Sequence, residues 1–102
     1  MAMDGRPIYA QNETFGIASA KALKELGYRI PEDISIVVSG SDFYSQYSEP
    51  KLTTITHSLK FVSENAVELL LKKINKKVTY KSIYLAIEPK LMVRESSAVN
   101  KL

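Results

Sequence analysis

The segment from Ile34 to Asp42 constrains the fold more than any other part of the sequence. It begins with an almost unbroken run of apolar residues, Ile34–Val38, in which the single polar residue is Ser35. Such a run is typical of a strand buried on both faces, as in a parallel sheet covered by helices. The run leads into a small, flexible turn, residues 39–41, and then into Asp42. Because ligands of open α/β sheets bind just beyond the carboxyl ends of such strands, we expect a functional site at this turn.

Helices and strands alternate on both sides of this run. Asn12 is a favoured N-cap for the first helix, Gly27 can end that helix, and Ser58 can cap the second. Clusters of β-branched residues predict the further strands. The predicted elements are a strand at Ile8–Ala10, a helix at Glu13–Leu26, the strand at Ile34–Val38, a strand at Leu52–Thr56, a helix from Leu59 to about Lys76, and a β-prone stretch at Tyr80–Val93. This order predicts an α/β layer structure with a mostly parallel sheet flanked by helices.

The first predicted helix carries more apolar surface than one packing face requires. One stripe at helical spacing is predicted to be its apolar face. The stripe consists of Phe15, Ala18, Ala22 and Leu26. A second apolar set, Ile17, Ala20 and Leu23, lies off that stripe and is available to another element or another subunit.

Length, charge and composition exclude several classes of function. The 102 residues suffice for one small domain, and the net charge of +3 bears on solubility rather than on nucleic acid. The chain has no cysteine and a single histidine, His57, which excludes disulfides, thiol catalysis and multi-histidine metal sites. We therefore predict no metal and no cofactor. No apolar run approaches the about 20 residues that span a bilayer, and residues 1–15 lack a signal pattern, so we predict a cytoplasmic protein without a membrane partner.

Three motifs, taken together and in order, carry a family resemblance that covers about Arg6 to Ser97. They are Ala10–Glu13 opening a helix that ends at Leu26–Gly27 and is followed by Ile30–Ser35, then Pro50–Ile55, and finally Leu91–Ser97. In this order they resemble the C-terminal part of a transcription regulator of the lactose/galactose-repressor family. The resemblance implies that residues 1–102 are a fragment of a type I, periplasmic-binding-protein-like core. Residues 1–7 would be a leader and residues 95–102 a polar tail, with the first lobe and the helix-turn-helix headpiece absent.

The resemblance also implies a function. Members of the family bind a sugar or a similar small effector between two lobes, form homodimers, and contact operator DNA through the headpiece. The chain is therefore expected to be a non-enzymatic part of a cytoplasmic repressor. On its own it should bind no operator DNA, and sugar at most weakly, because half of the cleft is missing.

Four residues are candidates for contacts with the effector. Asn12 and His57 match family positions that face the effector, and both side chains donate and accept hydrogen bonds, as sugar hydroxyls require. The family places an aspartate after the apolar strand, where an ungapped alignment puts Gly40 and a shift of two residues puts Asp42. We favour Asp42, with Ser41 beside it. The alternatives are a plain N-cap for Asn12, a solvated turn for Asp42 and a surface histidine for His57.

An aromatic cluster follows the turn, and the resemblance implies that it lies at a dimer interface. Phe43, Tyr44 and Tyr47 fall within five positions, and Ile17 on the first helix fits the same surface. Stacking on a sugar face and ordinary packing within one chain are the alternatives for these residues.

Other classes of function receive less support from the sequence. A hydrolase would use Ser41 or Ser39 with His57 and Asp42, but the Gly-x-Ser-x-Gly pattern is absent. A phosphate site at residues 39–41 would need a helix starting there, and none is predicted. A nucleic-acid site would use the lysines at positions 72, 73, 76 and 77, which are typical of a solvated helix end instead. A fragment of a transport-type sugar-binding protein, or a module that only dimerises, remains an alternative to the regulator.

Overall fold

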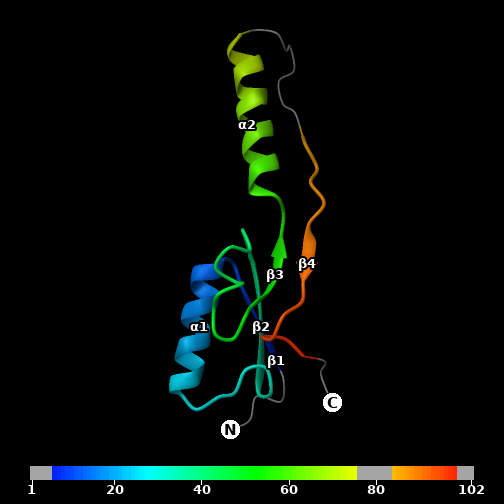
Figure 1. The fold of residues 1–102 in the computed structure, drawn as a ribbon. Coiled ribbons are helices and arrows are strands. Elements are labelled where there is room, and N and C mark those ends of the chain that lie inside the picture. Colours follow the sequence, from blue (N-terminus) through cyan, green and yellow to red (C-terminus); the bar gives the residue numbers. More distant parts are fainter. Residues whose placement is uncertain (1–5, 76–83, 99–102) are drawn as a thin grey trace.

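The computed structural model describes residues 6–75 and 84–98, which form an α/β unit with one four-stranded sheet (Figure 1). The strands lie in the order β1-β2-β3-β4; β2 pairs in parallel with β1 and β3, whereas β4 runs antiparallel to β3. The elements are β1 (Arg6–Ala10), α1 (Glu13–Glu25), β2 (Ile34–Gly40), β3 (Thr53–Thr56), α2 (Leu59–Ile74) and β4 (Lys90–Met92). The predicted α/β class with a mostly parallel sheet is confirmed.

Several boundaries differ from those expected. β1 starts at Arg6, inside the segment expected to be a leader. β2 continues to Gly40, so the strand itself includes most of the small residues expected to form a turn. In the β-prone stretch only Lys90–Met92 is a strand among the described residues; positions 80–83, like Lys76 and Lys77, lie outside them. Pro89, directly before β4, has no N–H to donate to a strand ladder.

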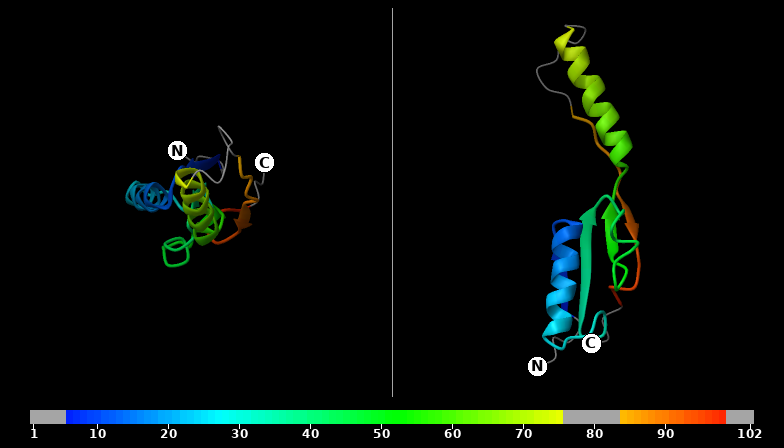
Figure 2. Two further views of the ribbon diagram at one scale, coloured as in Figure 1. Left: turned by 90° about the horizontal axis from the view of Figure 1, so that it is seen from above. Right: turned by 60° about the vertical axis from the view of Figure 1, so that its left-hand side comes forward.

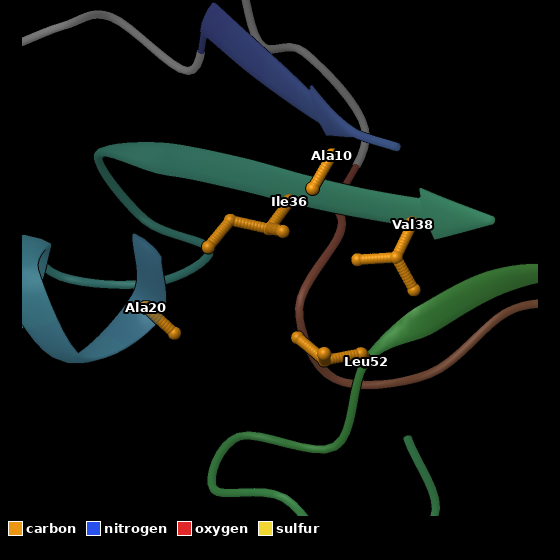
Figure 3. Packing of buried hydrophobic residues seen from close by; sticks show 5 residues of the cluster. All are labelled: Ala10, Ala20, Ile36, Val38 and Leu52. Atoms are coloured by element: carbon orange, nitrogen blue, oxygen red, sulfur yellow. The ribbon is translucent and has the colours of Figure 1, made fainter. Parts of the chain in front are cut away.

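The core lies between α1 and the central strands (Figure 3). Ile36 and Val38 of β2 are completely buried, and Leu52 packs with them just before β3. The helix approaches β2 through Gly16, where a Cβ atom would lie only 2.2 Å from Cγ1 of Val38. A side chain at this position would therefore push α1 away from the sheet.

The packing face of α1 is not the stripe predicted from the sequence. The buried residues of the helix are Glu13, Gly16 and Ala20, and Leu23 packs at the edge of the core. The predicted stripe of Phe15, Ala18, Ala22 and Leu26 is exposed instead. The prediction was wrong because it counted only apolar side chains, whereas the true face includes a glycine that permits close approach and a hydrogen-bonded carboxylate.

The segment after β4 is part of the folded body. Ser96 is completely buried; its hydroxyl donates to the carbonyl of Ile36 at 2.6 Å and accepts from the N–H of Thr53 at 2.8 Å. The backbone of Ser96 bonds to β2 and to Lys51 as well. Residues 95–98 are therefore no solvated tail, which corrects that part of the prediction, and residues 99–102 lie outside the described chain.

Helix α2 extends away from the rest of the molecule (Figures 1 and 2). The hydroxyl of Ser58 caps it by accepting from the N–H of Phe61 at 3.1 Å, as predicted. No residue of α2 is buried, and the molecule measures 60 × 25 × 18 Å. Its large exposed apolar side chains are Leu59, Phe61, Val67, Leu70, Leu71 and Ile74. Within residues 6–75 and 84–98, no helix is long and apolar enough to cross a membrane.

Candidate functional site

A hollow of about 550 Å³ lies where β3 passes into α2. It brings together three of the predicted site residues, Ser41, Asp42 and His57, at the carboxyl ends of β2 and β3. Asn12 does not line it. The described residues that line it are Ser41, Asp42, Thr56, His57, Ser58, Leu59, Phe61, Ile87, Glu88, Lys90 and Met92.

Asp42 forms one wall of the hollow and is paired with Arg94. Its Oδ2 accepts a hydrogen bond from Nη2 of Arg94 at 2.7 Å, and Oδ1 lies 2.5 Å from Nη1. Nη1 directs its own hydrogen bonds to the carbonyl of Leu52 and the hydroxyl of Thr54, so Oδ1 is buried without accepting one. The hydrogen bond with Asp42 raises the pKa of Arg94. Both side chains are about 15% exposed, so Asp42 is not the solvated turn residue of the alternative interpretation.

The backbone at Asp42 explains why this pairing is needed. Asp42 has φ of 76°, in the left-handed region that non-glycine residues seldom occupy. Aspartate tolerates this conformation better than most residues, and the two contacts with Arg94 hold the side chain in place. The pair therefore fixes the loop that follows β2.

Glu13 holds the same loop from the opposite side. Its side chain accepts from the Ser41 hydroxyl and from both the N–H and the hydroxyl of Ser45, each at 2.7 Å. Glu13 is only 5% exposed. Burial raises the pKa of Glu13, but the hydrogen bonds from Ser41 and Ser45 outweigh burial and hold the pKa below its usual value. No spacing signal in the sequence connects Glu13 with Ser45.

Gly40 gives Glu13 the space that it needs. A Cβ atom on Gly40 would lie 2.7 Å from Cγ of Glu13 and 2.9 Å from its Oε1. An aspartate at position 40 would therefore collide with Glu13. The carboxylate that lies beside Gly40 is therefore that of Glu13, from α1.

Asn12 and His57 occupy different environments. Oδ1 of Asn12 accepts from the N–H of Phe15 at 2.9 Å, which confirms its role as the N-cap of α1. His57 is exposed, follows β3 directly and lines the hollow. The Ser41 hydroxyl donates to Glu13, and the Asp42 carboxylate pairs with Arg94, so within the described residues neither side chain bonds to His57. The catalytic arrangement of a hydrolase is therefore not assembled.

The aromatic residues form an exposed cluster beside α1. The ring of Phe43 meets those of Tyr44 and Tyr47 edge-on, with centroids 5.1 and 5.8 Å apart, and all three residues are more than half exposed. Glu13 and Lys24 both bind this loop, the latter through a 2.6 Å hydrogen bond to the Glu49 carbonyl. We name this cluster, together with Ile17 of α1, the aromatic patch.

Helical geometry relates Ile17 to the loop. Positions 13, 17 and 24 fall on one side of α1. Glu13 and Lys24, at the two ends of this row, both bind the loop that carries the aromatic residues. Ile17 is 37% exposed and lies between them along the helix. Among the described residues, no group of three acidic or histidine side chains is placed to hold a metal ion.

The comparisons with known proteins point to one family. Residues 2–97 match the family described as a periplasmic binding protein-like domain. The HTH-type transcriptional repressor PurR of Vibrio vulnificus is 35% identical over 89 residues, which are 87% of this chain and 26% of that protein. The chain therefore spans about a quarter of the length of this curated relative.

Solved structures agree with this relationship. The transcriptional regulator CelR in its cellobiose complex is 28% identical with a TM-score of 0.81, covering 92% of this chain and 28% of that one. A LacI family regulator from Arthrobacter sp. FB24 in complex with lactose is 29% identical with a TM-score of 0.79, covering 93% and 36%. The chain belongs to the periplasmic-binding-protein-like family and corresponds to part of the effector-binding core of LacI-type transcription regulators.

Proposed function

We propose that this chain is the part of a LacI-type regulator that binds a sugar-type effector and dimerises. The observation that carries the proposal is the hollow lined by Ser41, Asp42 and His57 at the carboxyl ends of β2 and β3. Solved relatives that match this chain are named as complexes with cellobiose and lactose, which supports a sugar as effector. The matched relatives are named as repressors and regulators, so no reaction is assigned to the chain.

The proposed mechanism couples the effector to the dimer. The loop after β2 contributes Ser41 and Asp42 to the hollow and, directly afterwards, Phe43 to the aromatic patch. An effector that binds one geometry of this loop better than another shifts the population of both surfaces together. Operator DNA would be contacted by a headpiece outside this sequence, and such a regulator would act in the cytoplasm. Asn12, outside the lining of the hollow, contributes by fixing the start of α1.

Titration with cellobiose and lactose, followed by backbone amide chemical shifts, tests the proposed effector site. We expect saturable shifts at residues lining the hollow, with a dissociation constant on the order of 1 mM or weaker, because the chain spans only about a quarter of the length of a relative such as PurR. Tetraethylene glycol at the same concentration is the control for a solvent effect. A module that only dimerises would show no saturable shift with either sugar.

The aromatic patch predicts a homodimer that single substitutions weaken. Tyr47→Ser and Ile17→Lys should each raise the dimer dissociation constant about tenfold or more, because aromatic and apolar anchors at the centre of an interface carry most of its energy. Sedimentation equilibrium measures this constant. Phe15→Ser is the matched control, since Phe15 is exposed on the opposite side of α1. An equal effect of the control, or a chain that stays monomeric, would contradict the assignment.

A further inference from the structure

We propose that the sugar-binding carboxylate of the hollow is Glu88 and that Phe61 is the platform on which a sugar ring stacks. Both residues line the hollow. Neither belongs to the turn after β2, where the sequence pattern placed the site. This inference rests on the proposed function and changes which wall of the hollow recognises the ligand.

The first step is that Asp42 is already occupied. One oxygen accepts a hydrogen bond from Arg94, and the other lies against the same guanidinium and is buried from solvent. A sugar hydroxyl that donates to Asp42 would have to displace Arg94, which also bonds to Leu52 and Thr54. Breaking a mostly buried, hydrogen-bonded ion pair costs more than a single hydrogen bond to a hydroxyl returns.

The second step is that Glu88 is available. Among the described residues that line the hollow, Asp42 and Glu88 are the two carboxylates. Glu88 is exposed, and within residues 6–75 and 84–98 no cation is close enough to form an ion pair with it. An ionised carboxylate accepts charge-assisted hydrogen bonds from hydroxyls, and one carboxylate can accept from two neighbouring hydroxyls at once. Lys90 and His57 in the same lining supply donors for the sugar oxygens.

The third step is the apolar part of the lining. Phe61 is 47% exposed in the first turn of α2, where the Ser58 cap fixes its backbone. Leu59, Ile87 and Met92 line the hollow with it. A cavity with an aromatic wall and a few convergent polar groups is typical of small-molecule sites. The ligand class that fits is a neutral sugar with an apolar ring face and a pair of adjacent hydroxyls.

The test extends the cellobiose titration to variants of the full chain. Glu88→Gln keeps the size of the side chain and removes its charge, and should weaken binding about tenfold. Phe61→Ala should remove the upfield shift that an aromatic ring gives to the C–H protons of the sugar. Glu64→Gln, a carboxylate on α2 outside this hollow, is the matched control and should leave binding unchanged. In the unsubstituted chain, the largest amide shifts should lie at residues 61, 87, 88 and 90.

Two results would overturn the inference in distinguishable ways. One is saturable shifts centred on Ser41 and Asp42, with binding weakened by Asp42→Asn but not by Glu88→Gln. This result would show that the sugar contacts the loop after β2, which overturns the inference and leaves the proposed function standing. An absence of saturable shifts with both cellobiose and lactose would overturn the inference and the proposed function together.

Discussion

Replacing Arg94 with methionine should lower the free energy of unfolding by about 3 kcal/mol. The substitution leaves Asp42 mostly buried beside an apolar side chain, and it also removes the hydrogen bonds to the Leu52 carbonyl and the Thr54 hydroxyl. This loss of about 3 kcal/mol is at the low end of the range for a buried ion pair, because both side chains remain about 15% exposed to solvent. Urea unfolding of the variant and the unsubstituted chain measures the difference.

A double-mutant cycle separates the ion pair from the rest of the Arg94 contacts. If the unpaired carboxylate causes most of the loss, adding Asp42→Asn to Arg94→Met should restore a large part of the stability, because the buried charge is then gone. If the stability losses of the two single variants simply add in the double variant, the ion pair itself contributes little to stability. The loop after β2 would then be held mainly by Glu13 and Lys24.

Replacing Glu13 with glutamine should lower the free energy of unfolding by about 2 kcal/mol at neutral pH. The carboxylate accepts from the hydroxyls of Ser41 and Ser45 and from the Ser45 N–H. The glutamine side chain has one acceptor oxygen and an NH₂ donor, so it cannot satisfy all of these donors in a buried position. Glu25→Gln, at the exposed end of α1, is the control and should change stability by less than about 0.5 kcal/mol.

The Glu13 effect should depend on pH with a definite sign. The hydrogen bonds hold the pKa of Glu13 in the folded chain below its usual value of 4.5, despite burial. Its contribution is therefore fully present above about pH 4.5 and is lost as the pH falls through the folded-state pKa. The difference in unfolding free energy between the unsubstituted chain and Glu13→Gln should shrink in acid. A difference that stays constant down to pH 2 would contradict the argument.

The backbone plan of the protein could be predicted from its sequence because it follows from local signals. The apolar run at Ile34–Val38 predicts the buried central strand, which the structure extends to Gly40. The caps at Asn12 and Ser58 predict the starts of both helices. Gly27 adopts φ of 89° just beyond α1, as expected for a residue that ends a helix.

The arrangement of the site could not be predicted in the same way. Glu13 and Ser45 are 32 positions apart, and Asp42 and Arg94 are 52 apart, with no periodic pattern connecting them. Both contacts join polar side chains, which hydrophobic periodicity does not register. The same limit explains the wrong face of α1, because Gly16 packs through the absence of a side chain.

The burial of Ser96 has a consequence for the order of folding. Its hydroxyl bonds to Ile36, 60 positions earlier in the chain, and the Ala98 N–H bonds to the Ser35 hydroxyl, 63 positions earlier. Contacts between distant positions form late, since closing a long loop costs entropy before any contact offsets it. During synthesis, β2 can pair with β1 and β3 before residues 96–98 have been made, but its contacts with Ser96 and Ala98 form only afterwards. In that interval the strand is held by fewer bonds and is more open to association with other nascent chains.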